Sequence, residues 1–97
     1  MAEEVEGLKI LKQSKALGKL KKGDKIFING KEMRVDSQYV FMEHGKTKEM
    51  IIEFFNSDND REYQLRYFDD QVEMSLEVYE LQEEFQYVRR EPKTIAW

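Results

Sequence analysis

The Asn29-Gly30 pair, which lies between two short segments of alternating character, is the feature that most constrains the fold of this chain. Both residues tolerate the positive φ angles of a two-residue type I′ turn, so the pair favours a tight antiparallel hairpin. The resulting register pairs Ile28 with Lys31, Phe27 with Glu32, Ile26 with Met33 and Asp24 with Val35. It places Ile26 and Met33 in the core and turns Phe27 to the opposite, outer face.

Further segments with a period of two follow this hairpin and predict more strands. They cover residues 38–43, 48–55, 62–68, 72–79 and 85–90. Residues 48–55 carry apolar side chains on both faces, which is typical of a central strand. A short apolar stretch, 94–97, ends in a tryptophan that we expect to dock on the body. The pattern predicts six to seven strands in a small antiparallel barrel or roll.

The strands at 62–68 and 72–79 are expected to form a hairpin with a two-residue loop. This loop sets Arg66 opposite Glu73 on the wet face, where opposite charges stabilise a sheet by up to ~1 kcal/mol. On the inner face the same register pairs Tyr67 with Val72, Leu65 with Met74 and Tyr63 with Leu76.

Residues 3–20 are rich in good helix formers, with Gly7 and Gly18 as breakers, and predict an amino-terminal helix. Four lysines would form a narrow stripe on one side of it: Lys12, Lys15, Lys19 and Lys22. The sequence thus predicts a mainly β protein with an N-terminal helix, an α+β fold. It would comprise a lysine-rich helix or partly disordered arm at 1–22 and an antiparallel β-domain at 23–97.

Residues 23–30, in which turn residues flank a short apolar strand, resemble the corresponding part of small SH3-like barrels. The resemblance covers only the early part of the chain. It implies a fold and carries no function with it.

Charge is distributed unevenly along the 97 residues, whose net charge is −4. Residues 1–25 hold seven lysines against four acidic residues, a net of +3. Residues 26–97 hold nine basic and sixteen acidic residues, a net of −7. An acidic body disfavours nucleic acid over its main surface, but a basic arm can still contact nucleic acid or an acidic protein.

The chain has no cysteine, so it forms neither a disulfide nor a thiolate metal site. Its acidic start does not resemble a secretory leader, and no apolar stretch reaches the ~20 residues of a membrane helix. We therefore expect a cytoplasmic protein that does not associate with membranes.

No pattern of residues predicts catalysis, a metal or a cofactor. His44 is the only histidine and lies in a glycine-containing turn without an evident partner. The acidic residues from Asp58 to Asp69 lack the central glycine and the terminal glutamate of a calcium-binding loop. We expect a protein that is not an enzyme, and an enzyme or metal binder ranks third among its possible functions.

The leading hypothesis is a small interaction module that uses an outer aromatic face. Four aromatic residues fall out of phase with the inward-facing positions: Phe27, Phe55, Phe68 and Tyr79. Aromatic rings gathered on a surface indicate a contact with a protein partner or a second copy, unless the chain's own helix or last residues cover them. The alternative is a nucleic-acid-associated protein that binds through the lysine stripe, from Lys12 to Lys22.

Overall fold

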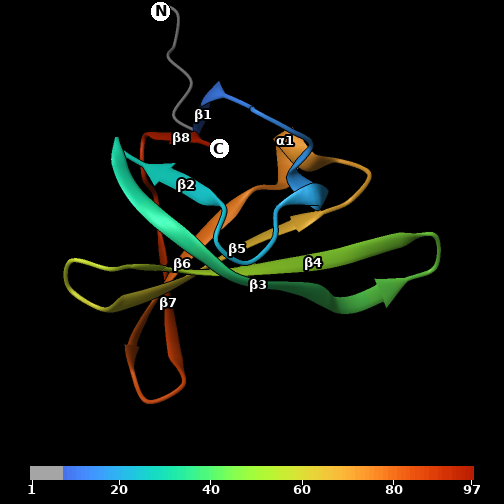
Figure 1. Ribbon diagram of the computed structural model, residues 1–97. Coiled ribbons are helices and arrows are strands. Elements are labelled where there is room, and N and C mark those ends of the chain that lie inside the picture. Colours follow the sequence, from blue (N-terminus) through green and yellow to red (C-terminus); the bar gives the residue numbers. More distant parts are fainter. Residues whose placement is uncertain (1–7) are drawn as a thin grey trace, which may run out of the picture.

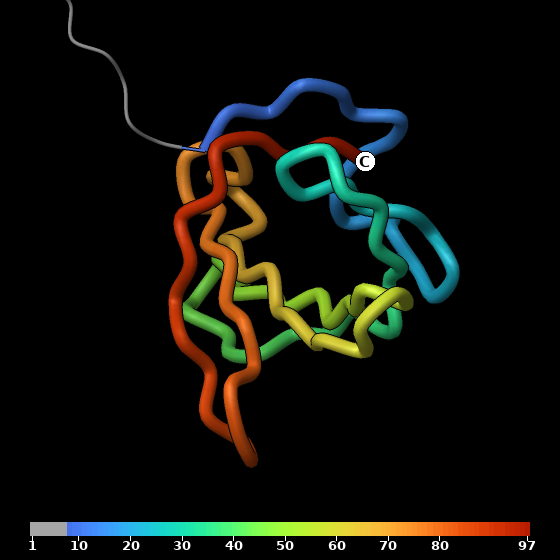
Figure 2. The backbone as a smooth tube through the Cα atoms, turned by 90° about the vertical axis from the view of Figure 1, so that its left-hand side faces the viewer, coloured from blue at the N-terminus to red at the C-terminus, as the bar shows by residue number. Residues whose placement is uncertain are grey.

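The structure, a computed structural model that describes residues 8–97, is one curled sheet of eight strands with very little helix. The sheet bends into a half-barrel whose strands wrap around one interior (Figures 1 and 2). Its strands lie in the order β1-β8-β2-β3-β4-β5-β6-β7. In chain order the elements are β1 (Lys9–Lys12), the 3-10 turn η1 (Leu17–Lys19), β2 (Lys25–Ile28), β3 (Lys31–His44), β4 (Thr47–Asn56), β5 (Arg61–Phe68), α1 (Val72–Ser75), β6 (Glu77–Glu83), β7 (Gln86–Arg90) and β8 (Thr94–Ala96).

The expected barrel of six to seven antiparallel strands is wrong. The sheet has eight strands, and β1 pairs with β8 in parallel. Within residues 8–97 the sheet also stays open, because β1 pairs only with β8 at one end and β7 pairs only with β6 at the other. The resemblance of residues 23–30 to small SH3-like barrels therefore does not extend to the fold.

The expected amino-terminal helix is also wrong within the described residues; positions 1–7 of the expected helix lie outside them. Residues 8–22 form a strand and a 3-10 turn in place of the α+β arrangement. The N–H of Lys9 donates to the carbonyl oxygen of Lys93 at 2.9 Å, and the N–H of Trp97 donates to that of Lys12 at 3.1 Å. These long-range bonds satisfy the backbone of β1, so pairing overrides a modest helix propensity.

The Asn29-Gly30 turn is confirmed. Both residues have positive φ, 52° and 82°, and Ile28 pairs with Lys31. The remaining pairs are Phe27 with Glu32, Ile26 with Met33 and Lys25 with Arg34. Asn29 does more than turn the chain, because its side-chain oxygen accepts hydrogen bonds from the N–H groups of Lys93 and Thr94 at 2.8 and 3.1 Å. The first hairpin thereby fixes the start of β8.

β3 is a single strand of 14 residues, although β2 covers only its first four. Its pairing with β4 shifts between Val35 and Ser37 and again between Val40 and Met42. Each irregularity is a bulge, which increases the twist and bends the strand. Residues 36–37 thus lie at a bend within β3.

The expected register of the hairpin after β5 is wrong. The chain makes the short helix α1 before β6 begins, so Leu65 pairs with Val78 and Arg66 with Glu77. The register is displaced by four residues from the expected one, and an even displacement leaves each side chain on its original face. Met74, which we expected in the core, is exposed on α1.

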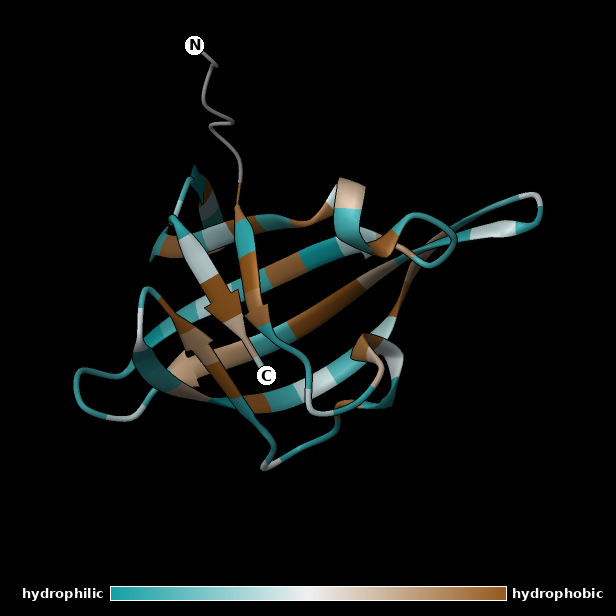
Figure 3. Ribbon diagram, turned by 90° about the horizontal axis from the view of Figure 1, so that it is seen from above, coloured by the Kyte–Doolittle hydropathy of each residue, from teal (hydrophilic) through white to brown (hydrophobic). Residues whose placement is uncertain are grey.

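The core fills the concave side of the sheet. It includes Ile26, Met33, Val35, Ile52, Phe54, Leu65, Tyr67, Val78 and Ile95, closed by Leu17, Leu20 and Trp97. Figure 3 shows hydrophobic and hydrophilic residues alternating along the strands, and loops that are mostly hydrophilic. Trp97 is buried, as we expected, and its indole N–H donates to the carbonyl oxygen of Lys15 at 2.7 Å. β4 is confirmed as a central strand, because Ile51 and Ile52 are both buried on opposite faces.

Candidate functional site

The four aromatic residues of the expected outer face are all half-buried, and the structure distributes them over four places. Phe27 lines a groove beside the N-terminal segment, and Phe55 lines a second groove on the outer side of β4. Phe68 lies at the end of β5, with its ring 5.8 Å from that of His44. Tyr79 lies on β6 under the side chain of Arg66.

Arg66 and its neighbours form what we call the outer platform, defined by Tyr39, Phe41, Arg66 and Tyr79. The guanidinium carbon of Arg66 lies 4.0 Å from the ring centre of Tyr79 and 5.8 Å from that of Phe41. Such contacts hold cation and rings in place. The side chain of Gln64, itself buried, accepts hydrogen bonds from Nε and Nη2 of Arg66 at 3.0 and 2.8 Å. These contacts hold the side chain of Arg66 in place against the two rings in the unbound protein.

Glu53 links the platform to β3. Its carboxylate accepts hydrogen bonds from the hydroxyl of Tyr39 at 2.9 Å and from the amide of Gln64 at 3.2 Å. Burial, and then the nearby carboxylate of Glu53, raise the pKa of Tyr39 to about 12. The hydroxyl of Tyr39 consequently stays protonated at neutral pH and acts as a donor.

The edge of β3 beyond Val35 is unpaired. Pairing between β2 and β3 ends at Arg34, followed by two backbone hydrogen bonds at Val35. Its N–H donates to the carbonyl oxygen of Asp24 at 2.8 Å, and its carbonyl oxygen accepts from the N–H of Gly23 at 2.9 Å. From there to His44 the strand pairs only with β4 among the described residues. Its side chains are unusually apolar for an edge, with Tyr39 40 %, Val40 43 %, Phe41 49 % and Met42 49 % exposed. We call residues 36–44 the free edge of β3.

The hairpin of β3 and β4 projects beyond the neighbouring strands (Figure 1), and its tip is tied to the turn after β5. Asp69 accepts a hydrogen bond from the N–H of Lys48 at 3.0 Å, and Asp70 accepts one from the hydroxyl of Thr47 at 2.7 Å. These two acidic residues, which the sequence suggests only as turn residues, hold the β4 side of the hairpin. The free edge lies on its opposite side.

A groove of about 240 Å³ lies on the outer face around Phe55. Three carboxylates line it, those of Asp36, Glu53 and Glu62, together with the ring of Tyr87. Asp36 occupies the first bulge of β3, so this acidic groove adjoins the start of the free edge.

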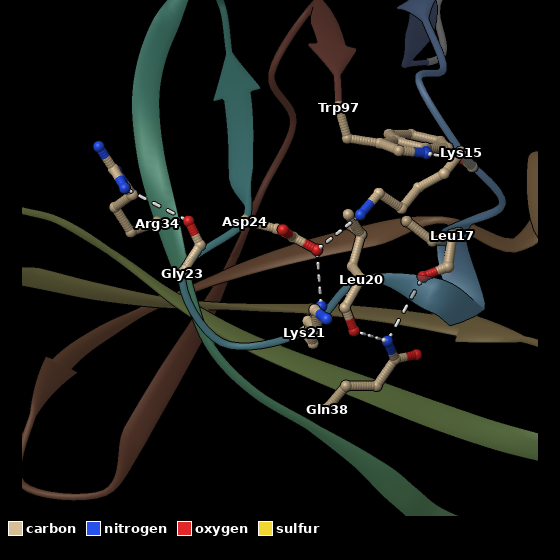
Figure 4. Close-up of polar contacts among 9 residues, drawn as sticks. All are labelled: Lys15, Leu17, Leu20, Lys21, Gly23, Asp24, Arg34, Gln38 and Trp97. Carbon is tan, nitrogen blue, oxygen red and sulfur yellow. Dashed lines mark hydrogen bonds and ion pairs between the residues drawn. The ribbon is translucent and has the colours of Figure 1, made fainter.

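The groove beside Phe27, of about 370 Å³, lies between the segment after β1 and the turn before β2. Lys12, Lys15 and Lys25 line it, together with Phe27. Figure 4 shows Lys15 running from beside Trp97 to the carboxylate of Asp24, 3.2 Å from its Nζ. Lys19 and Lys22 do not line this groove, so the expected lysine stripe is split.

The described residues contain few side-chain groups placed to catalyse a reaction or to bind a metal ion. His44 lies 3.4 Å from Glu49 but is exposed, at the hairpin tip. No group of three or more histidine, aspartate or glutamate side chains within residues 8–97 could hold a metal ion. Within the same residues, no helix is long and apolar enough to cross a membrane.

Sequence reasoning missed the free edge of β3 and the platform role of Arg66. Residues 39–42 form an apolar run without alternation, and this run next to a much shorter partner strand is the signal that could have indicated an exposed edge. Nothing in the sequence indicates that Phe27 lies near Lys12 and Lys15, because this proximity depends on the pairing of β1 with β8.

Comparison with known proteins yields no relative: no protein-family model, no curated protein and no solved structure matches this chain. Its function must therefore be argued from its own residues.

Proposed function

We propose that this protein is a non-enzymatic interaction module that binds an extended segment of a partner protein along β3. The free edge of β3, with four consecutive exposed apolar residues at 39–42, is the observation that carries the proposal. An unpaired strand edge offers N–H and C=O groups to another chain, and natural proteins usually protect such edges with charge or proline. Residues 39–42 have neither.

The outer platform supplies the side-chain contacts that accompany strand addition. In this mode the backbone gives affinity and alternate side chains give specificity. Tyr39 and Phe41 belong to both the free edge and the platform, and Arg66 and Tyr79 extend the platform onto β5 and β6. Rings already fixed by their neighbours lose little side-chain entropy on binding, which favours affinity. Phe55 and Phe68 lie apart from the platform, Phe55 in the groove with Asp36 and Phe68 beside His44.

The charged side chains around the free edge favour one kind of partner. The carboxylates of Asp36, Glu53 and Glu62 surround the groove at the start of the free edge and outnumber the cation of the platform, Arg66. Near the end of the edge, Glu43 lies opposite Lys48. A second copy would bring the same acidic groups to the interface, where like charges oppose association. A segment in which lysine or arginine alternates with apolar residues has the complementary charge and the period of a strand. We therefore propose a basic, extended segment as the occupant.

A synthetic peptide that alternates lysine with valine and threonine is a direct probe. We expect it to bind, to shift the backbone amide resonances of residues 36–44, and to protect amides of that edge from hydrogen exchange. Replacing Met42 with lysine should weaken binding about tenfold, since the new charge repels the probe and blocks the edge.

Met74→Lys is the matched control, because it makes the same change on α1, where Met74 is 87 % exposed. It should leave binding unchanged. Equal effects of the two substitutions, or amide shifts confined to other strands, would contradict the proposal. A dimer of the unliganded protein in sedimentation, lost on Met42→Lys, would show that a second copy takes the place of the basic segment.

A further inference from the structure

The groove beside Phe27 combines positive charge with an aromatic ring, and no residue of the free edge or of the outer platform lines it. The proposal made for it is independent of the function proposed for the free edge. Its volume of about 370 Å³ is within the range of small-ligand sites. It is lined by Lys12, Ser14, Lys15, Leu20, Gly23, Asp24, Lys25, Phe27, Ala96 and Trp97.

Three lysines line the groove against one side-chain carboxylate, that of Asp24, which is already engaged. Asp24 accepts a hydrogen bond from the N–H of Lys21 at 2.9 Å and from Nζ of Lys15 at 3.2 Å. Lys25 makes only a long contact, 3.8 Å, with Glu32, and Lys12 makes no ion pair within residues 8–97. At least two ammonium groups are thus available to an anion.

The ring of Phe27 lies at the side of the groove where two strands meet. Phe27 pairs across the sheet with Ala96 of β8, a residue with a small side chain. The ring is half-buried and remains in the lining of the groove. The sequence alone separates basic residues from aromatic residues, but the pairing of β1 with β8 and of β8 with β2 brings Phe27 beside Lys12 and Lys15.

We propose that this groove binds a nucleotide unit, with the base stacked on Phe27 and the phosphate held by Lys12 and Lys25. An aromatic ring beside lysines is the combination by which proteins bind single-stranded nucleic acid with little sequence preference. An acidic peptide would use the lysines but leave the ring without a partner. Because residues 26–97 carry a net charge of −7, the contact with a strand is expected to be short.

Anisotropy of a labelled single-stranded oligonucleotide at low salt tests the proposal. We expect binding that weakens as salt rises. The double substitution Lys12→Ala and Lys25→Ala should weaken it and lower the slope of log affinity against log salt by about two. Phe27→Leu keeps an apolar residue on β2, and it should weaken binding about tenfold with an unchanged salt slope, because no charge is lost.

Lys19→Ala with Lys22→Ala is the matched control, since both lysines belong to the N-terminal segment but do not line the groove. This pair should leave binding unchanged, and the thermal unfolding of every variant shows whether the fold is retained. Adenosine monophosphate as a competitor separates the two sources of a nucleotide: competition at similar concentration indicates a free nucleotide, whereas weak competition indicates a strand. No binding at low salt, an equal loss in the control pair, no effect of Phe27→Leu, or equal competition by polyglutamate would each overturn the proposal.

Discussion

The indole N–H of Trp97 donates a 2.7 Å hydrogen bond to the carbonyl oxygen of Lys15, across 82 positions of the sequence. The two backbones also meet nearby, because the N–H of Ser14 donates to the carbonyl oxygen of Trp97 at 2.6 Å. Trp97, which directly follows β8, therefore anchors the loop that follows β1.

Trp97→Phe should destabilise the protein. The substitution keeps a ring but removes the donor to Lys15 and leaves a small cavity, which together cost about 1–3 kcal/mol of unfolding free energy. Urea denaturation followed by circular dichroism measures the change. Met74→Ala, on the exposed face of α1, is a control that should change stability by less than about 0.5 kcal/mol.

Asn29→Gly should also destabilise, although glycine suits the positive φ of this turn position better than any other residue. The side-chain oxygen of Asn29 accepts two N–H groups at the start of β8, from Lys93 and Thr94, and glycine cannot replace it. We expect a loss of about 1 kcal/mol per hydrogen bond, partly offset by solvent. A variant as stable as the parent in urea denaturation would show that the turn conformation alone matters.

Glu80 should make stability depend on pH. Burial alone would raise the pKa of Glu80, but hydrogen bonds from Arg90 and Arg61 outweigh burial and hold the pKa below its ordinary value. A carboxyl group whose pKa is lower in the folded state stabilises the protein fully above its unfolded pKa of ~4.3 and loses this contribution as pH falls through the folded pKa.

Glu80→Gln is accordingly expected to cost about 1–3 kcal/mol at neutral pH. The difference from the parent should shrink in acid, because the parent carboxylate becomes protonated there. Unfolding free energies of both proteins between neutral and acidic pH measure this. A constant difference across that range would contradict the role of the ionised carboxylate.

The register between β5 and β6 can be checked by a pair of substitutions. Val78 is buried opposite Leu65, so Val78→Ala should cost about 1.5–3 kcal/mol. Met74→Ala should be close to neutral. The two-residue loop expected from the sequence would instead place Met74 in the core opposite Leu65, so a nearly neutral Met74→Ala decides against that register.

The sequence predicts most of the sheet where the determinants are local. The Asn29-Gly30 turn specifies its hairpin because only a few residues tolerate positive φ at two consecutive positions. Alternation also identifies inward residues such as Leu65 and Val78 correctly, even where the partner is wrong, because an even displacement preserves the face.

The rest depends on contacts between distant residues. Residues 9–12 become a strand only because β8 lies beside them, and no local preference predicts a parallel partner 84 or more positions away. Similarly, α1 replaces the first half of the expected strand, since residues 72–75 can make one helical turn before pairing begins. The candidate surfaces follow from the same contacts, because both the groove at Phe27 and the free edge of β3 are defined by which strands have neighbours.

The position of β8 between β1 and β2 has a consequence for how the molecule forms. β2 to β7 pair with their neighbours in sequence and need to close only short loops, whereas the pairing of Lys9 with Thr94 closes almost the whole chain. Closing such a loop carries a larger entropic cost, and contacts of this kind slow folding. The meander can therefore assemble first, and β1 gains a partner only when β8 has docked. The groove that contains Phe27 is therefore complete only when both β8 and β1 are in place.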